Sequence, residues 1–348
     1  MSKPQVSIVM PLHRHKYLDK ILKHMLSLSA MSSDVELVLC ENPAKTDEAA
    51  KIIAEYPMLN IQHIESEPGA NRARNKGIEH AKSDKIMLLD DDCVPEQEWL
   101  ASGLAGFTLY PQIGVFGGPM KLHFTCRHPR WVYSYFMGLL GQLDYGSINR
   151  DLSGVSYELD AGLVSGNIGF FKSAWEFGGG FDEDIGQCRG QNPGGVSEID
   201  EILFVNRLTD PRFKPAKMYF NGMMIWHQID ETRMNMDYFM KKAWSHGAGL
   251  ATICLKSPRI KDFTVEDIVS DLLPPQWHAL FEHHELSKAR AEIAHEESFR
   301  IYLKNLMICR TKFFDGFFYV LLSSDRRSYE SDPGQLFYIG QNFYDQFV

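Results

Sequence analysis

KIMLLDDDCVPEQE, residues 85–98, joins a short apolar run to three consecutive aspartates. The run at 86–89 has no polar interruption, which is typical of a strand buried on both faces in a parallel sheet. It ends at Asp90, Asp91 and Asp92, whose adjacent carboxylates repel one another. A folded chain therefore keeps these carboxylates at a strand end only beside a cation or in water.

The spacing of the three aspartates suits a divalent metal ion. On an extended segment Asp90 and Asp92 project to one side and Asp91 to the other. Two carboxylates on the same side are suitable ligands for a hard ion that keeps several waters and takes phosphate oxygens as further ligands. The alternative is a solvated acidic turn that only ends the strand. Pro95 then marks the start of a predicted helix over 95–107.

Upstream of this stretch, strand and helix patterns alternate at short spacing. Apolar runs predict buried strands, and apolar residues at helical spacing predict helices between them. The predicted strands are 6–10, 35–40 and 60–64, and the predicted helices are 18–26, 46–56 and 71–82. This alternation indicates βαβ units with right-handed crossovers, which place the loops after each strand at one edge of the sheet. Ligands of α/β proteins bind at that edge.

Downstream the alternation becomes irregular and then stops. We predict further strand material at 113–116, 160–171 and 218–226, and helices at 129–143, 199–208 and 235–255. Beyond residue 256 only helices are predicted, at 262–273, 276–287 and 288–323, the last broken near 314–316. The expected architecture is an α/β domain over 1–255, with a mixed, mainly parallel, Rossmann-like sheet flanked by helices, and a helical C-terminal region over 256–348.

Composition narrows the function classes. The net charge of −9 argues against a nucleic-acid-binding protein that depends on bulk positive charge. The six cysteines are scattered without a CxxC pair, which argues against a zinc site or a disulfide framework. There is no run of about 18 apolar residues and no apolar signal segment before the first strand, so we expect a cytoplasmic protein without a membrane span.

Six segments, in their order along the chain, carry a resemblance to a known family. They are VSIVMPLHRHKYL, CENPAKTDEA, GANRARNKGIEHAKSDKIMLLDDD, SGNIGFF, GGGFDE and DEILFVNRL. From residue 4 to about residue 250 the chain resembles the inverting nucleotide-sugar glycosyltransferases of family 2, which have the GT-A fold. The resemblance implies transfer of a sugar from a nucleotide-diphosphate donor to a hydroxyl group, with inversion and with Mn2+ or Mg2+ as the cofactor.

The resemblance assigns the metal ion to the aspartates and to a later histidine. Asp92 would hold the ion, with Asp90 assisting or gripping the ribose, and the ion would neutralise charge on the leaving diphosphate. Asp91, at the variable middle position, would contact the ribose or face solvent. His227, in the run IWHQ, would be the third metal ligand. The alternative for this residue is an ordinary core or surface histidine.

The catalytic base is expected in an acidic stretch before Arg207. Inversion requires a carboxylate that takes the proton of the attacking hydroxyl, and the family places it at the start of a helix that ends in Arg-Leu. The candidates are Glu198, Asp200 and Glu201. Because Asp and Glu stand in the reverse of the family's order, the base is not fixed, and we rank Asp200 first, Glu201 second and Glu198 third. The alternative is that these residues only cap the helix.

The remaining motifs are expected to bind the donor. Glu41 stands where the family has a nucleobase-binding aspartate, and Arg74 with Asn75 would contact the nucleotide or its phosphates unless they form an exposed helix face. Gly166 would line the sugar pocket because glycine lets a ligand approach the backbone. The loop 186–195 is a candidate lid. The full donor-binding set is Pro11, His13, Glu41, Arg74, Asn75, Asp90, Asp91, Gly166 and Asn167.

Two aromatic segments, 131–136 and 313–322, bear on partners and location. Neither carries a basic face, so we favour core packing or a homodimer interface over a surface that skims a membrane beside a lipid-linked acceptor. The expected partners are a nucleotide-sugar donor and a glycan, lipid-linked or other hydroxyl acceptor, with no nucleic acid. The expected location is the cytoplasm, with peripheral association at the inner face of the membrane as the alternative.

Two other functions share parts of the pattern. A sugar nucleotidylyltransferase has the sheet and the aspartates, but it needs a glycine-rich loop after the first strand, and PLHRHKYL contains no glycine. A catalytically inactive carbohydrate-binding or scaffolding relative stays open because of the reversed Asp200–Glu201 order. A dehydrogenase is disfavoured, since no GxGxxG motif follows the first strand.

Overall fold

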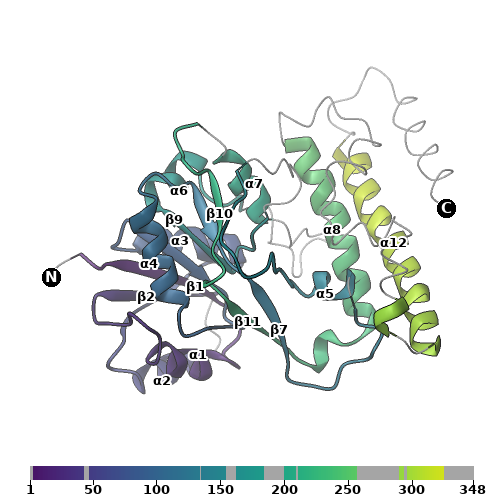
Figure 1. The fold of residues 1–348 in the computed structure, drawn as a ribbon, viewed down its shortest axis with the longest axis horizontal. Helices are drawn as coiled ribbons and strands as arrows, with labels where there is room; N and C mark the ends of the chain where they lie inside the picture. The colour runs from purple at the N-terminus through teal and green to yellow at the C-terminus, as the bar shows by residue number, and fades with distance from the viewer. Residues whose placement is uncertain are drawn as a thin grey trace.

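The protein is built around one large sheet, which lies in the left half of the view of the computed structural model in Figure 1. The structure describes residues 3–42, 47–133, 135–153, 162–183, 200–208, 211–256, 290–293 and 296–324. The sheet has eight strands in the order β3-β2-β1-β4-β9-β6-β10-β8. Their bounds are β1 Val6–Leu12, β2 Val35–Glu41, β3 Asn60–Glu65, β4 Lys85–Leu89, β6 Val115–Gly117, β8 Arg150–Asp151, β9 Asn167–Phe171 and β10 Lys217–Tyr219.

The first half of the sheet confirms the predicted βαβ units. Strand β1 pairs in parallel with both β2 and β4, and β2 pairs in parallel with β3. The connecting helices are α1 Leu18–Met25, α2 Glu48–Ala54 and α3 Ala70–His80. In β4, Ile86 and Leu88 pack into one hydrophobic cluster and Met87 and Leu89 into another, so this strand is buried on both faces. The uninterrupted apolar run is explained by this double burial.

Two strands in the second half of the sheet, β9 and the edge strand β8, run against the others. Strand β9 is antiparallel to both β4 and β6, and β10 is parallel to β6. Because β4 and β6 are both antiparallel to β9, they run in the same direction, and β10 runs with them. The carboxyl ends of β1, β2, β4, β6 and β10 therefore share one edge. The mixed, mainly parallel sheet is as predicted.

The helix predicted over 95–107 is displaced, because the residues after the aspartates form a strand. Strand β5 (Cys93–Pro95) pairs antiparallel with β11 (Ile225–Ile229), which also pairs in parallel with β7 (Met120–Phe124) in a separate three-stranded sheet. Helix α4 (Trp99–Leu109) begins only after this pairing. A partner strand about 130 residues away thus outweighs the local helix-start signal of the proline.

The predicted helix over 129–143 is also wrong in extent. The structure has only a short helix, α5, at Tyr135–Leu139. The backbone has turned by Gly141, which has a φ of +89°, and Leu143 then forms an antiparallel bridge with Met120. Two of the aromatic residues in 131–136, Tyr135 and Phe136, are nevertheless buried, and Trp131 and Phe136 pack edge-on against Phe239.

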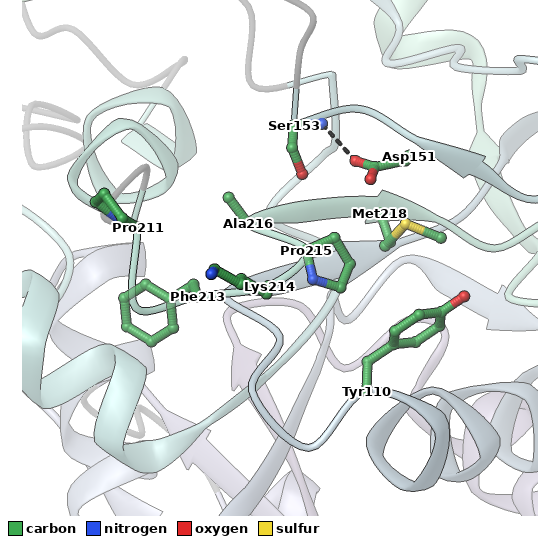
Figure 2. Close-up of a pocket in the computed structure, with 9 residues that line it drawn as sticks. All are labelled: Tyr110, Asp151, Ser153, Pro211, Phe213, Lys214, Pro215, Ala216 and Met218. Atoms are coloured by element: carbon green, nitrogen blue, oxygen red, sulfur yellow. Dashed lines mark hydrogen bonds between the residues drawn. The ribbon is translucent and has the colours of Figure 1, made fainter.

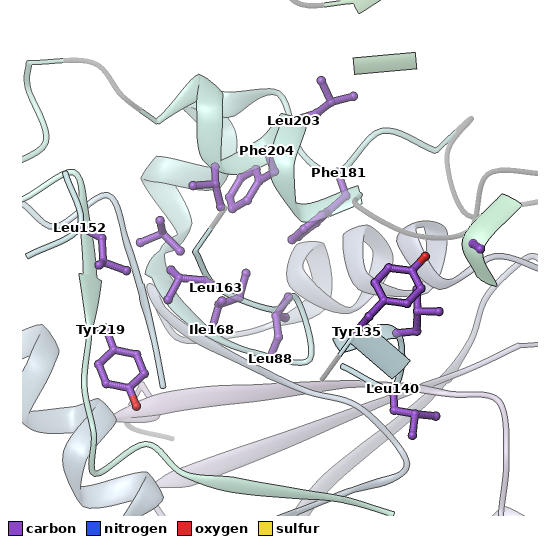
Figure 3. Packing of buried hydrophobic residues seen from close by; sticks show 14 of the residues in the cluster. Leu88, Tyr135, Leu140, Leu152, Leu163, Ile168, Phe181, Leu203, Phe204 and Tyr219 are labelled. Atoms are coloured by element: carbon purple, nitrogen blue, oxygen red, sulfur yellow. The ribbon is translucent and has the colours of Figure 1, made fainter. Parts of the chain in front are cut away.

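In the described part of the chain after residue 235, two long helices lie side by side, α8 (Met236–Lys256) and α12 (Glu296–Ser324) (Figure 1). One hydrophobic cluster, part of which is drawn in Figure 3, extends from Leu88 in the sheet to Tyr302 and Phe313 in α12. Helix α6 (Lys172–Gly178) contacts both β9 and α7 (Asp200–Arg207), and α7 in turn contacts α8. Among the described residues, none of the helices could cross a membrane. The helices predicted at 262–273 and 276–287 lie outside the described residues, and a domain boundary at 255 stays a prediction.

Helix α12 is not broken near 314–316, contrary to the prediction. It continues through Gly316, where an added Cβ atom would lie 2.0 Å from the carbonyl oxygen of Trp244 in α8. The glycine therefore serves the close approach of two helices and is not a helix breaker.

Gly316→Ala should lower the free energy of unfolding by about 1–3 kcal/mol, because overpacking against backbone costs more than the better helix propensity of alanine returns. Urea unfolding of the purified variant measures this. The neighbouring exposed change Asp315→Ala is the control and should stay within about 0.5 kcal/mol of the original protein. Equal stability of Gly316→Ala and the original protein would show that the two helices are not in such close contact.

Candidate active site

The three aspartates lie at the carboxyl edge of the sheet, and the middle one is the anchor. Asp91 is buried, and one of its carboxylate oxygens accepts the backbone N–H groups of His13 and Arg14 at 2.6 Å each. Burial raises the pKa of Asp91 to about 7, although the two N–H groups act in the opposite direction. Asp91 thus ties the loop after β1 to the end of β4 and does not face solvent.

Asp92 is surrounded by positive charge. Its Oδ2 atom accepts a hydrogen bond from Arg233, with Arg14 at 3.5 Å and the Nε2 atom of His227 at 3.3 Å. Burial alone would raise the pKa of Asp92, but the guanidinium groups of Arg233 and Arg14 hold it well below its usual range. Asp92 is therefore ionised at neutral pH, and its negative charge can bind a cation.

His227 lies beside Asp92 because β11 pairs with β5, which follows the aspartates directly. Its Nδ1 atom lies 2.7 Å from the carbonyl oxygen of Leu140, which can only accept, so Nδ1 carries the proton. The lone pair of Nε2 is then left facing Asp92, the arrangement that metal-binding histidines have. Asp92 and His227 fit a divalent ion, since one ion about 2.1 Å from each ligand could contact both.

Asp90, the remaining predicted metal ligand, is paired differently. Its Oδ1 atom lies 3.1 Å from Arg74, whose guanidinium also donates to Asn71 and lies over the ring of Phe181. Among the described residues, no three His, Cys, Asp or Glu side chains are grouped closely enough to hold a metal ion. The predicted trio is therefore not assembled in this structure, because Arg74 holds Asp90.

Gly166 fits closely against Asp90. A Cβ atom at this position would lie 2.5 Å from the Oδ2 atom of Asp90. This position thus leaves room for the Asp90 carboxylate, and the part of Gly166 in a sugar pocket stays a prediction.

Gly166→Ala should push Asp90 away from Arg74 and weaken nucleotide binding about tenfold, the equivalent of losing one charge-assisted hydrogen bond. Calorimetric titration with the nucleotide measures this effect. Gly179→Ala is a control for glycine replacement, since nothing lies within 4 Å of the added Cβ atom, although its positive φ costs some stability. Unchanged nucleotide affinity in Gly166→Ala would separate Asp90 from donor binding.

Glu41, the predicted nucleobase contact, is buried between two histidines. Its two carboxylate oxygens each lie 2.7 Å from a ring nitrogen, one of His15 and one of His63. Burial alone would lower the pKa of His15, but hydrogen bonds to Glu48 and Glu41 raise it above its ordinary value. Any nucleobase at this position would meet a histidine–glutamate cluster, and its contact with Glu41 stays a prediction.

Asn75 and Asn167 have their hydrogen-bonding capacity used inside the protein. The amide of Asn75 bonds with the backbone N–H and carbonyl of Phe181, both at 2.9 Å, and with the indole of Trp175. The amide of Asn167 accepts from the indole of Trp99 and donates to the carbonyl of Met223, both at 2.7 Å. Both residues hold neighbouring segments in place, and their contact with a donor stays a prediction, as does that of Pro11, which is buried in β1.

Helix α7 begins at Asp200, the residue ranked first as the base. Phe204 packs against Phe181, and Arg207 donates to the carbonyl oxygens of Gly178 and Gly180 at 3.0 and 3.2 Å. Since Phe181 also lies under Arg74, these contacts link the helix to the aspartate edge. The side chains of Asp200 and Glu201, all of Glu198, and the predicted lid at 186–195 lie outside the described residues.

Sequence reasoning missed four polar residues of this edge: Arg14, His15, His63 and Arg233. His15 and Arg14 stand in the motif PLHRHKYL, whose loop is expected to approach the nucleotide. The sequence signal that could have indicated Arg14 and His15 is their position directly after a buried strand. For His63 and Arg233 only the folded strand order shows the contact.

The cavity drawn in Figure 2 lies at the opposite edge of the sheet. Its volume is about 500 Å³, and its lining includes Tyr110 before β6 and the residues 213–216 before β10. Because β6 and β10 run in the same direction as β4, the space before them is at the amino edge, away from Asp90, Asp91 and Asp92. It is not part of the site described above.

The sequence is similar to those of known glycosyltransferases. The model of the glycosyl transferase family 2 matches residues 7–173. Among curated relatives, a glucosyl-dolichyl phosphate glucuronosyltransferase of Haloferax volcanii is 19% identical over 261 residues, 74% of this chain and 80% of that protein. Glycosyltransferase AglE of the same organism is 30% identical over 106 residues, 29% of this chain, so the match spans about a third (35%) of that relative.

Two solved structures have a similar fold at low sequence identity. The mannosyltransferase PcManGT of Pyrobaculum calidifontis, in complex with GDP-Man and Mn2+, has a TM-score of 0.52 and 13% identity, covering 95% of this chain and 89% of that one. Residues 1–349 of S. aureus TarS, in complex with UDP-GlcNAc, have a TM-score of 0.50 and 14% identity, covering 94% and 93%. With the strand order, these likenesses show the GT-A fold, and over residues 7–173, just under half of its length, the chain matches glycosyl transferase family 2.

Proposed function

We propose that this glycosyltransferase moves one sugar, with inversion, from a nucleotide-diphosphate donor to a hydroxyl acceptor, with Mn2+ or Mg2+ as its cofactor. The observation that carries the proposal is the pairing of Asp92 with His227 at the carboxyl edge of the sheet. The two solved structures support it, because both hold a nucleotide sugar and one also holds Mn2+.

The chain's own cations would stabilise the departing diphosphate. Arg14, Arg74 and Arg233 lie around Asp90 and Asp92, and a planar guanidinium can donate two hydrogen bonds to phosphate oxygens. Of these, Arg14 and Arg74 would lower the transition-state energy without further reorganisation, because they are already positioned where charge develops. A divalent ion held by Asp92 and His227 would supply additional positive charge for the same purpose.

The acceptor hydroxyl must lose its proton as it attacks the sugar. A carboxylate within hydrogen-bonding reach of that hydroxyl serves as the base, and Asp200 at the start of α7 is our first candidate. We propose a glycan or lipid-linked acceptor, because one relative is named for action on glucosyl-dolichyl phosphate. A cytoplasmic location, with peripheral association at the membrane, stays part of the proposal.

The decisive experiment is donor hydrolysis by the purified protein with Mn2+ and a panel of nucleotide sugars. A glycosyltransferase slowly releases nucleoside diphosphate from its donor, and EDTA should stop this release. Formation of pyrophosphate would instead indicate a nucleotidylyltransferase, a function that the family match disfavours. No turnover and no binding of any donor would indicate an inactive relative.

A further inference from the structure

Arg233 occupies the position between the two proposed metal ligands. One nitrogen of its guanidinium donates to the Oδ2 atom of Asp92, and the other lies within hydrogen-bonding distance of the Nε2 atom of His227. Its side chain is only 7% exposed, so this contact is made inside the protein. The same carboxylate oxygen and the same imidazole lone pair that fit a divalent ion thus hold an internal cation.

The position of Arg233 is built into the fold. It ends the short helix η1 (Glu231–Arg233), which follows β11 directly, and its backbone N–H donates to the carbonyl oxygen of Asp230 at 3.1 Å. Asp230 caps this turn through Thr232 and is itself bonded to Lys16 at 2.7 Å. The turn is therefore held at Asp230, and the long Arg233 side chain extends from its other end to Asp92.

The other nearby arginine has a different position. Arg14 lies 3.5 Å from Asp92, has a side chain that is 34% exposed, and comes from the loop after β1. It adds positive charge near Asp92, but no contact links it to His227 among the described residues. Arg14 thus carries the same charge as Arg233 near Asp92, but only Arg233 contacts both Asp92 and His227.

We propose that Arg233 is an internal counter-cation that holds Asp92 and His227 together and must be displaced for a divalent ion to bind. This inference rests on the metal in the proposed function. A lone pair that accepts a hydrogen bond from Arg233 is not available to a metal ion, so the two cations compete. The displaced guanidinium needs a new anion, which the diphosphate of the donor supplies. Metal and nucleotide should therefore strengthen the binding of one another.

Binding of Mn2+ without any nucleotide tests the competition. Electron paramagnetic resonance of free Mn2+ gives the dissociation constant for the original protein, Arg233→Met and Arg14→Met. We expect Arg233→Met to bind Mn2+ about tenfold more tightly, because the competing occupant is gone. Arg14→Met loses the same charge but not the bridge, so its constant should change less than about threefold. Addition of nucleoside diphosphate should then tighten Mn2+ binding more in the original protein than in Arg233→Met.

Unchanged or weaker Mn2+ binding in Arg233→Met would overturn the inference, as would an equal gain in Arg14→Met, which would indicate a general charge effect. If Arg233→Met does not fold, Arg233→Lys replaces it. One ammonium group balances the charge of Asp92 but cannot also reach His227 as the two guanidinium nitrogens do, so Mn2+ should again bind more tightly than to the original protein.

Absence of Mn2+ binding in every variant overturns the inference together with the proposed metal. Donor turnover in EDTA would then show that the glycosyltransferase activity itself stands.

Discussion

Asp92→Asn should lower the rate of sugar transfer by about a thousandfold, because the change removes the anion on which the cations of the site are arranged. The amide keeps the size of the side chain but cannot hold Arg233 or a divalent ion as a carboxylate does. Steady-state transfer and hydrolysis rates with the best donor measure the effect. Donor binding that depends on Mn2+ should be lost together with turnover.

A loss of folding could imitate this result, and the structure provides the control. Asp92→Asn leaves the buried Arg233 without its anion, which costs about 3–5 kcal/mol by comparison with other broken buried ion pairs. The double variant Asp92→Asn/Arg233→Met removes both charges and should recover most of that stability. A stable but inactive double variant, beside an Arg233→Met single variant that still transfers sugar, would assign a chemical role to Asp92. If the stable double variant transfers sugar at a normal rate, Asp92 has no such role.

The parts of the fold that the sequence predicted are those with local signals. Strand β4 could be predicted because burial on both faces requires every residue of 86–89 to be apolar. The helix start at Pro95 was wrong because β5 pairs with β11, and this contact depends on residues about 130 positions away. Gly316 was mistaken for a helix break because its cause, the backbone of Trp244, lies in another helix.

The same distinction holds for the site. The proximity of Asp92 and His227 could be expected from a family resemblance, and the structure shows them 3.3 Å apart. The part played by Arg233 could not be predicted, since its partner Asp92 stands 141 residues earlier in the chain and nothing in the run ETR distinguishes it from a surface turn. Pairings between ends of different strands are properties of the strand order and not of any one segment.

Asp200→Asn is expected to reduce transfer by about 10²–10⁴-fold, the usual contribution of a general base, while donor affinity stays the same. An amide cannot take the proton of the acceptor hydroxyl, but it leaves the cations around Asp92 unchanged. Rates of transfer, together with nucleotide binding followed by the thermal shift of the protein, separate the two effects. Glu201→Gln is the matched variant and should retain most activity if Asp200 is the base.

The competing explanation is that Asp200 only stabilises the start of α7, at which it stands. An acidic residue there contributes about 0.3–1 kcal/mol, and asparagine is nearly as good a residue at a helix start, so Asp200→Asn should fold almost normally. A folded, donor-binding but inactive Asp200→Asn therefore cannot be explained by the cap. If Asp200→Asn transfers normally while Glu201→Gln does not, the base is Glu201, in the reverse of our ranking. Normal transfer by both variants would leave Glu198 or a residue from another segment as the base.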